Sequence, residues 1–390
     1  FIHPSVRDRR KPVRDLFLLD PDVIFLNHGS FGACPRPVFE AYQAWQLELE
    51  RQPVEFLGRR CEELMREART VLADFVGAEA DDLVYVTNAT IGLNIVARSL
   101  PLQSGDEVLS TDHEYGALDR TWRFVCQKRG ARYVRQPLPL PATSAEQVGE
   151  AIWAGVTERT RVLFVSHITS PTAIILPVAE LVRRARGAGI ITVVDGAHAL
   201  GQIPLDLAAL GADFYVGNCH KWLMAPKGAA FLYARREVQP LLHPLVVSWG
   251  WMSERPGPSR FVDHHEWQGT RDIAPFLTVP AAIQFAEAWN WPHVRTACHE
   301  LVRCARHAIT ARTGLAPLTP DGPDWFAQMA AFPLPCDDTG ELQRRLYDEW
   351  RIEIPISVWN ERPLIRISIQ GYNTPADVDA LIEALTVLLK

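Results

Sequence analysis

Two residues of this sequence, an aspartate and a lysine, stand where a cofactor-dependent enzyme would need them. Asp195 closes one short run of strand-like residues, and Lys221 lies 26 positions later, just after the next such run. A lysine amine can form a Schiff base with the aldehyde of pyridoxal 5'-phosphate (PLP). An acid can keep the pyridine nitrogen of PLP protonated, so that the ring accepts electrons. The pair therefore predicts a PLP enzyme.

Each of these residues also has a simpler explanation when taken alone. A lysine just past a strand end is more often a surface residue, and an aspartate there is often a cap. His198 and His220 stand close by in the sequence, and the combination favours a cofactor site. The same histidines, or the run 263–266, could suggest a metal. Because neither set has a spacing such as H-E-x-x-H, no metal is expected.

A short polar stretch, Thr87-Asn88-Ala89-Thr90, precedes a helix that is expected to begin near Ile91. Backbone N–H groups and hydroxyls at a helix start can hold a phosphate. The same residues also make a good N-cap. With a lysine and an acid elsewhere in the chain, we interpret the stretch as a phosphate cradle.

The region between about residues 82 and 235 supplies the elements that must position these groups. Apolar, β-branched runs alternate there with helical stretches such as 178–188. Such runs predict a mostly parallel sheet covered by helices on both faces. Ligands bind at the carboxyl ends of the strands in sheets of this kind, and Thr87, Asp195 and Asn218 fall there. The expected strands are 83–86, 107–110, 161–165, 190–194, 213–216 and 229–233.

The chain changes character on either side of this α/β core. An amphipathic helix is expected before the core, ending near Gly77. A stretch rich in Pro and Trp, 241–280, has little periodicity and is expected to wrap the site. The C-terminal part predicts a smaller α+β unit, with strands at 326–334, 352–356 and 364–369 and helices at 340–350 and from Thr374-Pro375. We therefore expect a large domain over 26–284 and a small domain over 285–390. Residues 1–25 are expected to join the small domain.

Composition and charge limit the classes of function. The 390 residues carry a net charge of −6 and a pI of about 6.1, so no nucleic-acid or membrane partner is expected. No run approaches the roughly 18 apolar residues of a spanning helix, and no secretory signal is expected. The seven cysteines are scattered without a C-x-x-C pair. This pattern predicts reduced thiols in a cytoplasmic protein.

These motifs resemble the class V aminotransferase family of fold-type I PLP enzymes, and more closely its isopenicillin N epimerase-like branch. The resemblance covers nearly the whole chain and is specific for superfamily and cofactor, but much less for substrate. It rests on Asn27-His28-Gly29-Ser30-Phe31-Gly32, Asp195 to His198, His220-Lys221-Trp222, Trp267-Gln268-Gly269-Thr270-Arg271-Asp272, Arg366-Ile367-Ser368 and Tyr372-Asn373. The fold-type I architecture, a large parallel-sheet domain with a smaller α+β domain, is what this likeness implies.

The resemblance also implies which residues hold the cofactor. Lys221 would be the Schiff-base lysine, Asp195 the partner of the pyridine nitrogen, and His198 a hydrogen-bond partner of the ring hydroxyl. The phosphate would be held by Thr90, the Ala89 backbone, Asn218 and His220.

Further roles follow for the substrate and for a second subunit. Arg366 would grip the substrate carboxylate, a two-pronged task that suits a guanidinium group. Asn27 and His28 are also assigned to substrate binding. Thr270 would reach the phosphate in the neighbouring subunit, which implies a homodimer.

Two departures from the related cysteine desulfurases affect these expectations. Those enzymes stack a histidine on the cofactor, and we assign that place here to Tyr115, with His113 second. They also carry a nucleophilic cysteine on a loop before the last strands. The corresponding stretch, 352–363, contains no cysteine. A persulfide-forming desulfurase is therefore not expected.

The resemblance leaves the reaction open after the first step. In that step Lys221 would remove the α-proton of an amino acid, giving a quinonoid. Epimerisation, with Tyr115 or His28 returning a proton to the opposite face, is favoured. A C–S β-lyase acting on a cysteine conjugate is second, and an aminotransferase is third.

Two other classes of protein stay open beside these reactions. They are a metal-dependent hydrolase and a non-catalytic protein on an enzyme scaffold. The substrate side chain is not specified either. The tryptophans between 249 and 291 could line a pocket for a bulky substrate, or simply pack in the core or an interface.

Overall fold

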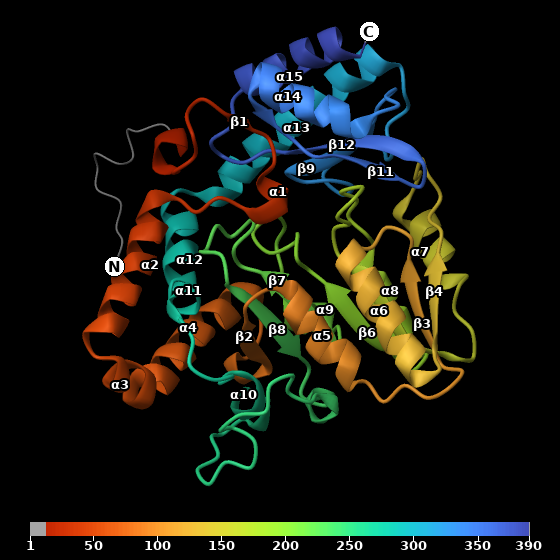
Figure 1. Ribbon diagram of the computed structural model, residues 1–390. Coiled ribbons are helices and arrows are strands. Elements are labelled where there is room, and N and C mark those ends of the chain that lie inside the picture. The colour runs from red at the N-terminus through yellow and green to blue at the C-terminus, as the bar shows by residue number, and fades with distance from the viewer. Residues whose placement is uncertain (1–12, 390) are drawn as a thin grey trace.

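The computed structural model describes residues 13–389, and its centre is a seven-stranded sheet (Figure 1). β8 runs antiparallel to both of its neighbours, and the other strands are parallel to one another. This confirms the expected α/β class. In spatial order the strands are β2 (Leu83–Val86), β8 (Ala230–Ala234), β7 (Phe214–Asn218), β6 (Ile191–Asp195), β5 (Thr160–Ser166), β3 (Glu107–Thr111) and β4 (Arg132–Gln136).

Alternate residues of the central strands enter two different cores. On β5, Val162 and Phe164 pack into one core and Leu163 and Val165 into the other. Side chains alternate across a strand, so the apolar runs cover both faces of the sheet. α5 (Ala89–Ser99) and α6 (Gly116–Arg129) cover the first face. The second face is covered by α4 (Cys61–Val76), α7 (Ala145–Trp153), α8 (Val178–Gly187) and α12 (Val279–Ala288).

The sequence analysis did not predict β4. It lies at the edge of the sheet, and its residues are exposed or only half-buried. An edge strand with one neighbour need not be apolar on both faces, so Arg132 and Gln136 can stand in it. The period that identifies a buried strand is therefore missing there.

The C-terminal part forms a separate antiparallel sheet with its own core. β9 (Met329–Pro333) and β11 (Ile356–Trp359) flank β12 (Arg362–Ser368). Figure 1 shows this part, in blue, above the larger sheet. Its helices are α13 (Trp291–Thr313), α14 (Thr339–Trp350) and α15 (Pro375–Leu388). Thr374 caps α15 in a capping box with Asp377, as the sequence predicted for the start of this helix.

The N-terminal residues join the C-terminal part. β1 (Ile24–Phe25) pairs in parallel with β10 (Ile352–Glu353). Of the expected joining segment 1–25, residues 1–12 lie outside the described residues. The boundaries 26–284 and 285–390 stay a prediction.

The remaining helices are short or lie around the large sheet. They are Val13–Leu16, α1 (His28–Phe31), α2 (Arg36–Arg51), α3 (Pro53–Glu55), the π-helical turn Phe56–Arg60, Ala80–Asp82, α9 (Leu207–Leu210), Gln239–Leu241, α10 (Arg260–His265) and α11 (Ala274–Leu277). Within residues 13–389, none of the helices has the length and apolar character needed to span a membrane.

Candidate functional site

A cavity of about 390 Å³ lies at the carboxyl ends of the central strands. Ser166, Asp195 and Asn218 are the last residues of β5, β6 and β7, and all three line it. Parallel strands end at the same edge of a sheet, which is why residues far apart in sequence meet there. The other lining residues are Ser30, Phe31, Thr87, Asn88, Ala89, Thr90, Tyr115, Leu118, Ile168, Ser170, Ala197, His198, His220, Lys221 and Gly228.

Lys221 reaches the cavity from the loop after β7. Its Nζ lies 3.2 Å from Nε2 of His198, in the loop after β6. Burial, reinforced by the charge of Arg366, lowers the pKa of Lys221 to about 7. A substantial fraction of the amine is therefore neutral near pH 7 and can act as a nucleophile or base.

Asp195 is the acidic group of the cavity. Its Oδ1 accepts a hydrogen bond from the Ala197 N–H at 2.9 Å. Burial raises the pKa of Asp195, while that hydrogen bond and the charge of Lys221 oppose the rise. A buried carboxylate without a close cation is suited to hold a protonated ring nitrogen.

The other end of the cavity is lined by hydrogen-bonding groups at the start of α5. Asn88 caps this helix by accepting from the Ile91 N–H at 2.9 Å. The Ala89 N–H donates to Oδ1 of Asn218, also at 2.9 Å. The Thr87 hydroxyl is buried and finds no hydrogen-bond partner within the described part of the chain. An unsatisfied hydroxyl beside a helix start is what an added phosphate would complete.

The residues present fit PLP. A cavity of this volume is in the range of small-molecule sites. It offers an amine for an aldehyde, an acid for a ring nitrogen and helix-start donors for a phosphate. Of the nine residues predicted to hold the cofactor, eight line this cavity: Ala89, Thr90, Tyr115, Asp195, His198, Asn218, His220 and Lys221.

The two aromatic candidates for stacking have different surroundings. Tyr115 precedes α6, lines the cavity and is 47% exposed. His113 is fully buried, with Nδ1 2.7 Å from the Thr172 hydroxyl and its ring 4.2 Å from the Trp359 ring. His113 is not among the lining residues. Of the two, Tyr115, the first choice from the sequence, is the one that lines the cavity, and its stacking role stays a prediction.

The three residues predicted to bind substrate, Arg366, Asn27 and His28, are not among the residues that line the cavity. Arg366 donates to the Ser170 carbonyl oxygen at 2.6 Å and to the Ser30 hydroxyl at 3.3 Å, and both serines line the cavity. Burial lowers the pKa of Arg366 to about 10, and its Nε has no hydrogen-bond partner among the described residues. The guanidinium group thus keeps unused donor capacity.

Asn27 and His28 do not line the cavity and make hydrogen-bond contacts with other groups of the protein. The Asn27 amide donates to Glu353 at 3.0 Å. His28 lies 3.0 Å from the Tyr372 hydroxyl through Nδ1 and 3.0 Å from the Lys221 carbonyl oxygen through Nε2. Their assignment to substrate binding stays a prediction.

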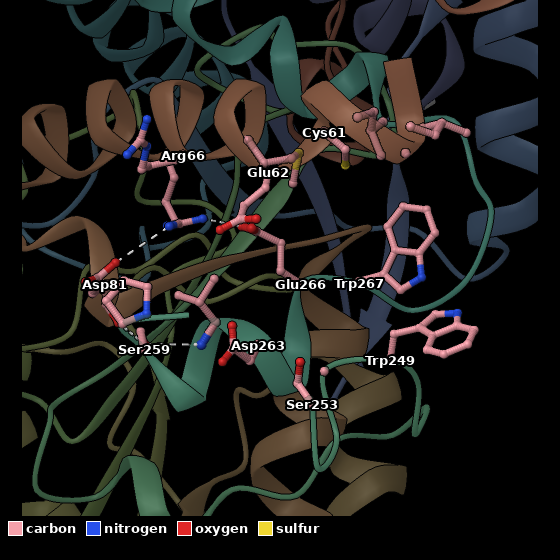
Figure 2. Close-up of a pocket in the computed structure, with 18 of the residues that line it drawn as sticks. Cys61, Glu62, Arg66, Asp81, Trp249, Ser253, Ser259, Asp263, Glu266 and Trp267 are labelled. Atoms are coloured by element: carbon pink, nitrogen blue, oxygen red, sulfur yellow. Dashed lines mark hydrogen bonds and ion pairs between the residues drawn. The ribbon is translucent and has the colours of Figure 1, made fainter. Parts of the chain in front are cut away.

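Neither Thr270 nor any other residue of the Trp-rich stretch 241–280 lines this cavity. Thr270 is exposed. Trp249 and Trp267 line a second cavity of about 450 Å³ beside α4 and α10, opposite Asp81 (Figure 2). The stretch 241–280 was expected to wrap the site, and its residues that line this second cavity do not line the first. Trp291 packs into the core.

Sequence reasoning missed several residues of the site. Ser166 ends β5 directly beside Asp195 in the sheet register, and Ser170 follows in the next loop. Glu114 lies behind them, buried, and accepts hydrogen bonds from the hydroxyls of Ser166 at 2.6 Å and Thr111 at 2.7 Å. The polar residue that closes the run 161–165 could have identified Ser166. Nothing in the sequence marked Glu114, because a D-H-E-Y loop is equally compatible with solvent.

Between residues 13 and 389, no group of three or more His, Cys, Asp or Glu side chains is arranged to hold a metal ion.

Comparisons with known proteins agree with this geometry. Residues 32–381 match the family described as aminotransferase class-V. An isopenicillin N epimerase of Amycolatopsis lactamdurans is 39% identical, over 97% of this chain and 98% of that protein. A probable chloroplastic L-cysteine desulfhydrase of Arabidopsis thaliana is 30% identical, over 95% of this chain and 84% of that protein. The crystal structure of the cysteine desulfurase CsdA from Escherichia coli has the same fold, with a TM-score of 0.80, 24% identity and coverage of 96% and 97%.

Proposed function

Because this chain belongs to the class-V aminotransferase family, whose members use PLP, we propose that it is a PLP-dependent amino-acid epimerase similar to isopenicillin N epimerase. The observation that carries the proposal is 39% identity to isopenicillin N epimerases over nearly the full length. The cavity supports it, since a base and a second proton donor both line the same space.

In this proposal the residues of the cavity divide the work of holding PLP. Lys221 would bond to the aldehyde, Asp195 would hold the pyridine nitrogen, and His198 would face the ring hydroxyl. Thr90, the Ala89 backbone, Asn218 and His220 would surround the phosphate. When bound, PLP supplies a ring that accepts the electron pair left on the substrate α-carbon.

Epimerisation needs a base on one side of the α-carbon and an acid on the other. Lys221 suits the base, because burial lowers its pKa to about 7. Tyr115 suits the acid, since it carries a phenol O–H and is a lining residue that is 47% exposed. His28 was the other candidate, but it does not line the cavity. Its two ring nitrogens contact the Tyr372 hydroxyl and the Lys221 carbonyl oxygen. The proton that Lys221 takes from one face would be replaced by the Tyr115 proton on the other.

Arg366 would hold the substrate carboxylate in this scheme. Ser170 and Ser30 fix the guanidinium group from two sides, which restricts the orientation of the α-carbon toward Lys221. Restricting orientation in this way lowers the entropic part of the barrier.

A C–S β-lyase is the second candidate, because several relatives at about 30% identity carry the name L-cysteine desulfhydrase. A persulfide-forming desulfurase is not proposed. The residues that line the cavity include no cysteine, and burial raises the pKa of Cys34 to about 12, which disfavours a thiolate.

We also propose a homodimer in which Thr270 reaches the partner's phosphate site. Thr270 is exposed and does not line the cavity of its own chain, which is compatible with that role. A cytoplasmic location stays a prediction.

The deciding experiment is incubation of PLP-loaded protein with L-amino acids and cysteine conjugates in deuterated water. Deuterium at the α-carbon together with D-product supports the epimerase. Release of pyruvate and a thiol without D-product would replace it with the lyase. Absence of a visible cofactor band after PLP addition would contradict the cofactor itself.

A further inference from the structure

We propose that Trp222 is a positioning residue that fixes the tautomer of His198. In this proposal the indole N–H holds the imidazole proton on Nε2, the nitrogen that faces Lys221. The consequence for the cofactor rests on the proposed function, whereas the tautomer itself does not.

Both ring nitrogens of His198 lie within hydrogen-bond distance of a neighbouring side chain. Trp222 Nε1 donates to Nδ1 of His198 at 3.3 Å. An indole nitrogen is a donor only. Nδ1 must therefore accept, and a neutral imidazole then carries its single proton on Nε2. That nitrogen lies 3.2 Å from Nζ of Lys221.

The surroundings keep His198 neutral. Burial lowers its pKa well below the ordinary value, and the charges of Lys221, Arg366 and His220 lower it further. Asp195 is the acidic group that lines the same cavity. With the ring neutral, the two tautomers differ in whether Nε2, the nitrogen that faces Lys221, carries the proton and can donate.

Trp222 is held firmly enough to impose this choice. It is fully buried, and its ring lies 5.0 Å from the His28 ring. Gly201 lies against its backbone with a φ of +83°, where a Cβ would approach the Trp222 carbonyl carbon to 2.5 Å. On the other side, the Gln202 amide donates to the His198 carbonyl oxygen at 2.7 Å. Neither partner can turn away without disturbing this packing.

The tautomer determines what His198 presents to the site. A proton on Nε2 requires the Lys221 amine to accept, and only a neutral amine can do so. The same N–H would donate to the ring oxygen of PLP and stabilise its anionic form. The opposite tautomer would present a lone pair to that oxygen.

The first test needs no cofactor. Nitrogen-15 spectra of unloaded protein labelled at the histidine rings report which ring nitrogen carries the proton, with His198→Gln identifying the signals. We expect Nε2–H in the wild type and loss of that single form in Trp222→Phe. Trp122→Phe is the matched control, because Trp122 is also fully buried and its Nε1 has no partner among the described residues. A proton on Nδ1 in the wild type would overturn the proposal.

The second test follows the visible absorbance of PLP-loaded protein against pH. Loss of one fixed donor to the ring oxygen should raise the midpoint by about 1 pH unit, a tenfold change in proton affinity. Trp122→Phe should leave the midpoint in place. In a His198→Gln background, Trp222→Phe should no longer move it, because the two residues act as one unit. An unchanged midpoint in Trp222→Phe with His198 intact would contradict the proposal.

A third variant guards against loss of folding. A benzothienyl analogue at position 222 keeps the ring shape and replaces the N–H with sulfur, so it should reproduce the shift seen in Trp222→Phe. If PLP gives no visible band with the wild type, the proposed function fails. The nitrogen-15 result on the unloaded protein would still decide the tautomer.

Discussion

Two cavities of the large domain differ in how their charged side chains are paired. In the second cavity, beside α4 and α10, Arg69 is 2.6 Å from Glu266 and 3.6 Å from Asp81. In the cavity at the strand ends, Lys221, Asp195 and Arg366 form no ion pair with any residue between 13 and 389. Arg69 and Glu266 are largely shielded from solvent, as Asp195 is, but only Arg69 and Glu266 have an ion-pair partner at close range.

This difference separates a structural role from a chemical one. A buried charge is costly, and a close partner offsets part of that cost. Charges left without partners lower stability and shift in pKa, so their presence in a cavity points to chemistry. Burial lowers the pKa of Lys221 to about 7, whereas Arg69 supplies Glu266 with a partner that opposes the effect of burial.

The strongest test of the comparison removes the lysine. Lys221→Ala should lower turnover by roughly three orders of magnitude or more, as deletion of a catalytic group commonly does. Borohydride should no longer fix PLP to the protein. Thermal unfolding should show no loss of stability, because an unpaired buried amine has been removed. A clear drop in melting temperature would mean that Lys221 also has a structural role.

Breaking the ion pair of the second cavity should have the opposite outcome. Arg69→Ala leaves Glu266 buried without its closest partner, so unfolding should become easier by about 3–5 kcal/mol. Denaturant titration measures the loss, and turnover per folded molecule should stay within a factor of two or so of wild type. As a control, Arg69→Met with Glu266→Met should recover most of the stability. A large loss of turnover would instead assign this cavity to function.

Arg366 tests whether an unpaired guanidinium group is held for the substrate. Arg366→Lys keeps the charge but loses the forked geometry fixed by Ser170 and Ser30. We expect KM for the amino acid to rise about tenfold to a hundredfold, the equivalent of one charged hydrogen bond. Steady-state kinetics measure this rise. Equal KM values in the two proteins would remove Arg366 from substrate binding.

The smallest expected effect comes from Glu114 and is a dependence of the unfolding free energy on pH. Burial raises its pKa to about 7 against the opposing hydrogen bonds of Ser166 and Thr111. Between the ordinary pKa of a glutamate and about pH 7, Glu114 therefore holds its proton more often in the folded protein than in the unfolded chain. Across that window its contribution to stability falls as pH rises, by up to about 1.4 kcal/mol per pH unit.

The matched variant is Glu114→Gln, which does not titrate. Unfolding free energies measured from pH 4 to 8 should show the wild type losing stability relative to the variant as pH rises. A difference that stays constant with pH would show that Glu114 does not titrate as its burial implies.

Sequence periodicity predicted the buried elements well, because burial on both faces of a strand leaves an apolar run. Six of the central strands and the start of α15 follow from such patterns. The edge strand β4 was missed for the opposite reason, since its side chains are half-exposed. The stretch 352–356 was expected as one strand, yet the backbone divides it into β10 and β11, which belong to different sheets.

Site residues could be predicted where they end a strand. They were much harder to predict where they contact the lining residues from a neighbouring loop. Asp195 and Asn218 could be placed because strand ends converge. Glu114 and the Trp222–His198 contact depend on how loops pack against one another. Local sequence carries no periodic signal for such contacts. The same limit applies to the contacts of His28 with Tyr372 and the Lys221 carbonyl oxygen.

The contact between His28 and Tyr372 joins residues that are 344 positions apart along the chain. A ribosome therefore completes the strands, the phosphate cradle and the lysine loop long before it releases the residues that brace them. A growing chain would complete the residues around Lys221 first and gain β12, with Arg366, and Tyr372 only later. A chain cut before β12 should keep the lysine but lack the Tyr372 contact that holds His28 against its backbone.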